Sequence, residues 1–248
     1  MKIGILGCFY DCAEDIDEVL QPWGKLKNES EHEVIITSVH SQFKEYAQMG
    51  MPDFDGVTAA KVADNKNVDL PFTSMVPLTE AEARSLPLGY LLQQEVDMFW
   101  MLDGDEFYTY EDINSILNYV IENPDYYYYK INFKNYIFDG EKWIDGFCPN
   151  RIFWTNKEEK VSKFYYDNDI LYESGKRQPD LSCSEIPREI AHIRHMTWLH
   201  SNGEKKVKYQ EKHFGECSYL WNRDTSELEF NSSYYKKHNK EAPVVNED

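Results

Sequence analysis

The chain has 248 residues and a mass of 29.3 kDa, and its 26 basic and 44 acidic side chains give a formal net charge of −18. Hydrophobic residues make up 42% of it, which is enough for a folded core and excludes a wholly disordered chain. No apolar run approaches the roughly 18–20 residues that cross a bilayer, and residues 1–7 are too short and too soon followed by acidic residues for a signal peptide, so we expect a soluble, cytoplasmic protein.

The first strands and helix are indicated by apolar spacing. Residues 1–8 form an apolar run that predicts a buried strand, and residues 13–26 carry apolar side chains at helical spacing. Residues 32–39 are rich in β-branched side chains and predict a second strand. Residues 41–77 contain scattered glycines, prolines and charges, so we expect an irregular stretch with a short helix or strand inside it.

Two further helices surround a third strand. Thr79 followed by Glu82 is a capping-box pattern and predicts a helix over residues 79–95. The apolar run at 96–102 ends abruptly in acidic residues, which suits a central strand, and a last helix begins at Thr109 or Tyr110 and ends before Pro124. This alternation predicts an α/β fold, with a mostly parallel sheet, helices on both faces and a ligand site beyond the carboxyl ends of the strands.

The second half has a different composition. Residues 126–154 are dense in β-formers, and 15 of the 37 aromatic residues fall between 126 and 172. Asp139-Gly140 and Asp145-Gly146 are turn dipeptides, so antiparallel strands and hairpins are expected. We therefore divide the chain into residues 1–125, an aromatic-rich antiparallel half of the same domain at 126–235, and a flexible polar tail at 236–248.

The motif Asp103-Gly104-Asp105-Glu106-Phe107 follows the apolar run that predicts the third strand. Residues i and i+2 of an extended chain point to the same side and lie roughly 6–7 Å apart. Asp103 and Asp105 can therefore share one Mn²⁺ or Mg²⁺, and Gly104 keeps the space between them open. A charged turn is the alternative, because Asp-Gly is a common turn dipeptide. The position of the motif at the expected ligand-binding edge of the sheet favours a metal site.

This arrangement resembles the metal-dependent glycosyltransferases of the A fold (GT-A), in particular the family-two-like enzymes with a D-x-D motif. In those enzymes a hydrophobic strand ending in D-x-D follows a helix with a donor-binding arginine, and here Arg84 lies 19 positions before Asp103. Residues 1–10 resemble their first strand and nucleotide loop, which implies donor contacts from Phe9 and Tyr10. The resemblance covers about residues 1–125, and only DGDEF is specific. Ser85-Leu86-Pro87 stands where the family has glycine and asparagine.

The resemblance also implies functional residues near the C-terminal end. A downstream histidine often adds a metal ligand in such enzymes, and a basic loop closes over the donor diphosphate. His195, followed by Lys205 and Lys208, looks like that pattern. Imidazole suits Mn²⁺ better than Mg²⁺, so a histidine ligand would favour manganese. A structural role for His195 remains the alternative.

An acceptor site is suggested by residues 143–154, where an acid is flanked by aromatic side chains. Aromatic faces can stack on sugar or base rings, and a carboxylate can take the proton of an acceptor hydroxyl. Asp145 is our candidate base, with Glu185 and Asp169 as substitutes. The alternative is a hairpin core in which Asp145-Gly146 is only the turn.

Together these features predict a glycosyltransferase, either a hexosyl- or a pentosyltransferase, that moves a sugar from a nucleotide-diphosphate sugar to a hydroxyl. A UDP-sugar is the expected donor, bound by residues 1–125, and the metal would neutralise the leaving diphosphate. Residues 126–235 would bind the acceptor. The alternatives are a metal-dependent nucleotidyltransferase and a non-catalytic carbohydrate-binding module with structural calcium at DGDEF. No protein partner and no membrane contact are indicated.

The acceptor is predicted to be a glycan or, as the minority prediction, hydroxymethylated viral DNA. Small enzymes of this type occur in phages, by resemblance, and the chain would then work in the host cytoplasm. The charge argues against DNA. Residues 1–124 hold 7 basic and 23 acidic side chains, a balance of −16, whereas residues 125–248 hold 19 and 21, a balance of −2. Phosphate contacts would therefore have to come from the second half.

Overall fold

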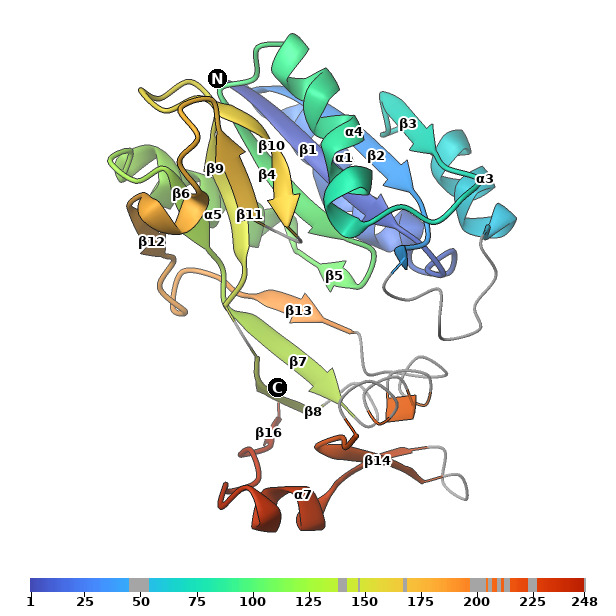
Figure 1. Ribbon diagram of the computed structural model, residues 1–248. Coiled ribbons are helices and arrows are strands. Elements are labelled where there is room, and N and C mark those ends of the chain that lie inside the picture. The colour runs from blue at the N-terminus through green and yellow to red at the C-terminus, as the bar shows by residue number, and fades with distance from the viewer. Residues whose placement is uncertain are drawn as a thin grey trace. The chain divides into compact units, whose positions relative to one another are not determined.

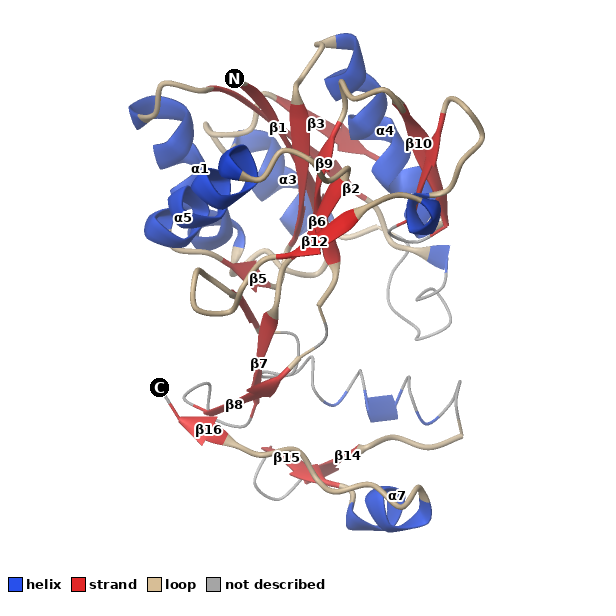
Figure 2. Cartoon of the chain, turned by 90° about the vertical axis from the view of Figure 1, so that its left-hand side faces the viewer, coloured by secondary structure: helices blue, strands red, loops and turns tan. Residues whose placement is uncertain are grey.

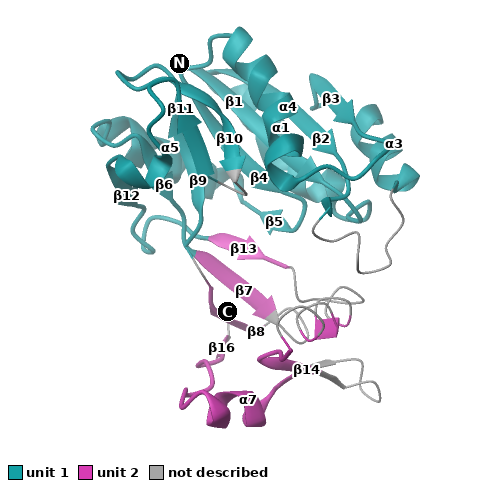
Figure 3. Ribbon diagram, viewed as in Figure 1, with its two compact units in different colours: residues 1–132, 148–192 teal, residues 133–147, 193–248 magenta. Residues whose placement is uncertain are grey.

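A computed structural model describes residues 1–44, 54–137, 142–146, 148–166, 169–196, 204, 207–208, 211, 215–222 and 227–247. The chain forms two compact units (Figure 1, Figure 3). Unit 1 comprises residues 1–132 and 148–192, and unit 2 comprises residues 133–147 and 193–248. The expected division into a donor half at 1–125, an acceptor half at 126–235 and a flexible tail at 236–248 stays a prediction.

Unit 1 is built on a seven-stranded mixed sheet with strand order β12-β6-β9-β4-β1-β2-β3. Strands β3, β2, β1 and β4 run parallel to one another, β9 is antiparallel to both β4 and β6, and β12 is parallel to β6. The bounds are β1 Lys2–Phe9, β2 Glu33–His40, β3 Leu70–Thr73, β4 Met98–Asp103, β6 Tyr128–Lys130, β9 Asn150–Trp154 and β12 Cys183–Glu185. The predicted mixed α/β fold, with a parallel part and an antiparallel part, is confirmed.

Helices cover both faces of this sheet. Helices α1 and α5 lie on one face, and α4 with strand β10 lies on the other (Figure 2). The remaining bounds in unit 1 are α1 Ile16–Glu29, α3 Gly56–Asp64, α4 Glu80–Gln93, β5 Glu106–Phe107, α5 Tyr110–Glu122, β10 Val161–Tyr166, β11 Asp169–Tyr172 and the 3-10 helix η1 Gln178–Asp180. The predicted capping box starts α4, since Thr79 Oγ1 accepts from the Glu82 amide at 3.2 Å and the Glu82 carboxylate accepts from the Thr79 amide at 2.8 Å.

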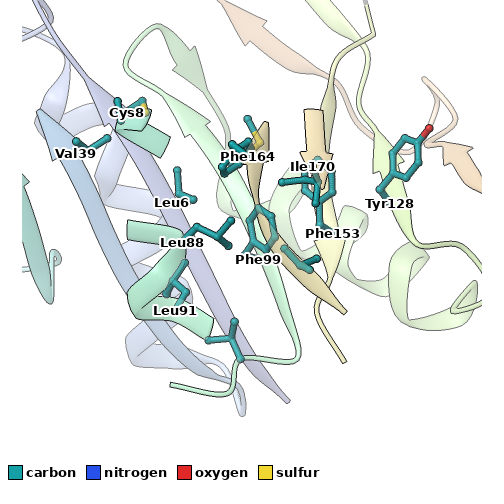
Figure 4. Packing of buried hydrophobic residues seen from close by; sticks show 14 of the residues in the cluster. Leu6, Cys8, Val39, Leu88, Leu91, Phe99, Tyr128, Phe153, Phe164 and Ile170 are labelled. Carbon is teal, nitrogen blue, oxygen red and sulfur yellow. The ribbon is translucent and has the colours of Figure 1, made fainter. Parts of the chain in front are cut away.

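The core follows the alternation of side chains along β1 and β4. Leu6 and Phe99 point to the α4 side, where Phe99 stacks on Phe153 of β9 with ring centroids 4.9 Å apart (Figure 4). Trp100 points to the opposite side and meets Trp23 of α1 edge-on at 4.8 Å. Because successive residues of β4 alternate in this way, Asp103 at its end points to the same side as Phe99, toward α4.

Unit 2 contains a small sheet, a hairpin and a short helix. Strands β7 (Phe133–Ile137) and β8 (Lys142–Asp145) are antiparallel, β13 (Ile193–His195) is parallel to β7, and β16 (Asn246–Glu247) pairs with β8. The last of these falls within residues 236–248, which the sequence predicts as a tail. The hairpin is β14 (Tyr219–Asn222) with β15 (Glu227–Phe230), followed by α7 (Ser232–Lys237). The turn expected at Asp139-Gly140 lies outside the described residues.

None of the helices among the described residues is both long enough and apolar enough to cross a membrane.

Candidate functional site

The carboxyl ends of β1, β2 and β4 meet at one edge of the unit 1 sheet. In the parallel register Cys8 pairs with Asp103, and Phe9 pairs with His40. The nucleotide loop expected at Phe9 and Tyr10 therefore begins beside the DGD motif. A Cβ atom added to Gly104 would lie 3.4 Å from the Phe9 ring. Parallel sheets commonly bind ligands beyond this edge.

Two buried arginines hold the carboxylate of Asp103. Its Oδ1 is 2.9 Å from Nη2 of Arg84 on α4, and its Oδ2 is 3.0 Å from Nη2 of Arg151 on β9. Both arginines are only 2% exposed, whereas the Asp103 side chain is 23% exposed. The sequence resemblance predicted Arg84 as a donor contact, and in the structure its guanidinium pairs with Asp103. It did not predict Arg151, which is followed in β9 by three apolar residues, and that neighbourhood indicates burial but not the partner.

Each arginine is fixed by a further carboxylate. Glu80 accepts from Arg84 Nε at 2.9 Å and lies 2.7 Å from Nη2, one helical turn away. Glu106 is completely buried and accepts from Arg151 Nε at 2.9 Å and also from Nη2. Burial raises the pKa of Glu106 to about 8, against the opposing effect of Arg151. Charges as deeply buried as these persist only when they are paired, and here they form one connected network.

The backbone of the motif is held by close packing. A Cβ atom at Gly104 would lie 2.5 Å from Sγ of Cys12, so only glycine fits there without a shift of its neighbour. Cys12 is itself buried, and its amide donates to Thr58 Oγ1 at 3.2 Å. Burial, followed by the charge of Asp105, raises the pKa of the Cys12 thiol well above its usual value. Asp105 is half-buried and close to this thiol.

A buried histidine lies at the end of the neighbouring strand. His40 is 1% exposed, and its ring lies 5.6 Å from Tyr10 and 5.3 Å from Phe54, centroid to centroid. Within the part of the chain that the structure describes, neither ring nitrogen has a hydrogen-bond partner. Burial lowers the pKa of His40, with Asp55 opposing. Buried polar atoms are rarely left unpaired, so this imidazole is an unusual feature of the edge that the sequence did not indicate.

The charges at this edge suit a divalent cation. Four acidic side chains, Glu80, Asp103, Asp105 and Glu106, lie at this edge with only two arginines, Arg84 and Arg151, among the ion pairs that the described residues form there. Each oxygen of Asp103 has a second lone pair besides the one that faces an arginine. Across the described ranges no group of three or more His, Cys, Asp or Glu side chains is placed to hold a metal. Asp103 and Asp105 thus offer the oxygen donors that Mg²⁺ and Mn²⁺ take, and further ligands would have to come from outside this pair.

The other predicted residues are distributed over both units. In unit 2, His195 stacks on Phe133 with centroids 4.6 Å apart, and its Nδ1 lies 2.7 Å from Asn135 Oδ1. Asp145 is exposed at the end of β8, directly opposite Lys134 of β7. Lys208 pairs with Glu204 at 2.8 Å, and Lys205 lies outside the described residues. The substitutes for Asp145 belong to unit 1, with Glu185 exposed on β12 and Asp169 half-buried on β11.

Comparison with known proteins finds similarity in structure only. No family of proteins matches the chain, and no curated protein matches its sequence. Among solved structures, S. aureus TarS 1–349 is similar at 13% identity and a TM-score of 0.46, over 87% of this chain and 72% of that one. The same TarS fragment in complex with UDP gives 12% and 0.47 over the same shares, and in complex with UDP-GlcNAc it gives 11% and 0.46 over 87% and 73%. At these identities and TM-scores the similarity concerns the backbone fold alone and assigns no function to any residue.

Proposed function

We propose that this protein is a metal-dependent glycosyltransferase that moves a sugar from a nucleotide-diphosphate sugar, a UDP-sugar, to a hydroxyl acceptor. The observation that carries the proposal is the DGD motif at the carboxyl edge of the parallel strands. There Asp103 is oriented by two buried arginines and lies next to the loop that begins at Phe9. A carboxylate fixed in this way at a sheet edge can hold the divalent cation that stabilises an anionic leaving diphosphate.

In this proposal Asp103 and Asp105 hold Mn²⁺ or Mg²⁺, which supplies the positive charge that neutralises the leaving diphosphate. Arg84 is too buried to be a surface contact, so its part is to hold Asp103 through Oδ1. Tyr10, half-buried directly after β1, offers an aromatic face beside the motif, whereas the buried ring of His40 packs against Tyr10 and Phe54. A planar nucleobase stacks on such an aromatic face.

The remaining residues keep the roles that the sequence resemblance implies. His195 is proposed as a further metal ligand, which would favour Mn²⁺. Asp145 is proposed as the base that deprotonates the acceptor, with Glu185 or Asp169 as substitutes, and Lys205 and Lys208 as contacts of the diphosphate. The acceptor is a glycan or, as the minority proposal, hydroxymethylated DNA.

The test is release of UDP from a panel of UDP-sugars, including UDP-GlcNAc, with Mn²⁺, with Mg²⁺ and with a chelator. We expect slow metal-dependent hydrolysis without acceptor. Asp103→Asn and Asp105→Asn should each lower it by at least about 100-fold, because each removes a charged ligand. Asp64→Asn, the same change at an exposed position on α3, should leave it unchanged. Activity of the two variants within a few fold of the parent chain would refute the metal site.

Two further arms separate the other functions. Release of pyrophosphate from a nucleoside triphosphate would indicate a nucleotidyltransferase, and turnover of neither substrate would indicate a binding module. For the acceptor, transfer to hydroxymethylated DNA is compared with transfer to free glycans from about 20 to 300 mM salt. Transfer to DNA that disappears with salt, while donor hydrolysis persists, would support the viral-DNA proposal. Transfer to a glycan alone would refute it.

A further inference from the structure

Arg151 contacts two acidic side chains, Asp103 at the end of β4 and Glu106 of β5. Its Nη2 faces both Oδ2 of Asp103, at 3.0 Å, and Oε1 of Glu106. Its Nε donates to Glu106 at 2.9 Å, and its Nη1 donates to its own strand at the Asn150 carbonyl, at 3.0 Å. All three nitrogens of the guanidinium are thus engaged, so the plane of the group is fixed.

We infer that Arg151 is a positioning residue of this site, which fixes the orientation of the Asp103 carboxylate through Oδ2 while Arg84 fixes Oδ1. The inference rests on the proposed function. A carboxylate bonded through one oxygen can rotate about its terminal torsion, which is a broad and soft one. One that is bonded through both oxygens, to groups on α4 and β9, has a single orientation. A metal ligand needs such a fixed orientation before the substrate arrives.

Stability of the fold alone does not account for this arrangement. Replacing a buried ion pair by apolar side chains of similar volume is often neutral or stabilising. The neighbours of Arg151 in β9, Ile152 and Phe153, are completely buried, so an apolar side chain would suit the strand. A lysine would keep the charge but lacks the planar fork, so it cannot bond Glu106 and Asp103 in the same geometry. The site therefore requires the shape of the guanidinium as well as its charge.

The test compares Arg151→Lys with Arg188→Lys, the same chemical change at an exposed arginine of unit 1. Turnover of the UDP-sugar, its KM and the melting temperature are measured on each folded variant. The affinity for Mn²⁺ in the presence of UDP is measured by electron paramagnetic resonance. For Arg151→Lys we expect turnover to fall about 10- to 100-fold and Mn²⁺ affinity about 3- to 10-fold, with KM within about 3-fold. Arg188→Lys should match the parent chain.

A double-mutant cycle tests whether Arg151 acts through Asp103. In an Asp103→Asn background, Arg151→Lys should lower Mn²⁺ affinity by less than about 2-fold further, because the carboxylate that it orients is gone. The inference is overturned if the two substitutions lower Mn²⁺ affinity by factors that multiply in the double variant. It is also overturned if the Arg151→Lys variant has parental turnover. If Arg151→Lys does not fold, Glu106→Gln carries the same measurements, since it loosens Arg151 while keeping the shape of its partner. If the parent chain turns over UDP-sugars and binds Mn²⁺, and the variants show the same turnover and affinity, only the positioning role is refuted. A parent chain that does neither refutes the proposed function and with it this inference.

Discussion

Replacing Gly104 by alanine should destabilise the folded chain, because the new methyl group has no room. Its Cβ would lie 2.5 Å from Cys12 Sγ and 3.1 Å from Cys12 Cβ. Ordinary contacts between non-bonded carbon atoms are about 3.5–4.0 Å, so the sulfur would have to withdraw by roughly 1 Å. Cys12 is buried and its amide is bonded to Thr58, which limits that movement.

The magnitude follows from two opposing contributions. Overpacking of this kind costs about 1–3 kcal/mol. Alanine also restricts the unfolded chain, which returns about 0.4–1 kcal/mol where the backbone conformation suits it. Gly104 is not among the glycines with positive φ, so that condition is met. We expect a net loss of about 1–2 kcal/mol in the free energy of unfolding.

Urea unfolding of four variants measures this loss and identifies its cause. Gly89→Ala is the matched control, since nothing lies within 4 Å of the added atom inside helix α4. It should stabilise the chain by up to about 1 kcal/mol. Cys12→Ala removes the obstructing sulfur, so the double variant with Gly104→Ala should be more stable than the sum of the single changes by about 1 kcal/mol. Additivity within about 0.5 kcal/mol, or a Gly104→Ala variant as stable as the control, would refute the packing argument.

Two further predictions concern pH. Burial lowers the pKa of His40 below its usual 6.5, so the folded chain binds fewer protons there than the unfolded chain, and stability should fall as the pH drops below about 6.5. Urea unfolding between about pH 5 and 8 should show a smaller slope for His40→Phe, and an equal slope would contradict a buried neutral imidazole. The amide of Thr79, followed by Lys44, lowers the pKa of Glu82 to about 2 from 4.5. Its contribution to stability is therefore present above pH 4.5 and lost as the pH falls through about 2, so Glu82→Gln should flatten the acid limb of the stability curve.

The elements of the first half could be predicted because their signals are local. The pair Thr79 and Glu82 marks the start of α4 within four residues of sequence, and both hydrogen bonds of the capping box are present. The apolar run at 96–102 contains enough consecutive buried side chains to indicate β4, which ends at Asp103. Such patterns depend on neighbours a few positions away, and these are fixed by the covalent chain.

The partners of the site could not be predicted in the same way. Arg151 reaches Asp103 across 48 positions of sequence, and it does so because β9 adds antiparallel to β4. No pattern in the sequence around residue 103 indicates that β9 pairs with β4. In the sequence Glu106 resembles an ordinary acidic residue of a polar turn. In the structure it is the most deeply buried acidic side chain of the site, because Arg151 and Tyr108 donate hydrogen bonds to it. The pairing of buried charges is a property of tertiary structure, so single-sequence patterns do not contain it.

The pairing of Asp103 and Glu106 with Arg151 also has a consequence for the order in which the chain folds during synthesis. A ribosome delivers Asp103, Asp105 and Glu106 well before it delivers β9, so for 45 positions after Glu106 the nascent chain has no Arg151 to bury beside it. Burying an unpaired carboxylate costs about 3–5 kcal/mol, which is a large share of the stability of a domain. The nascent sheet is thus expected to keep this edge hydrated until β9 emerges and docks. When β9 docks, the acidic side chains at this edge exchange water for Arg151 and become fixed.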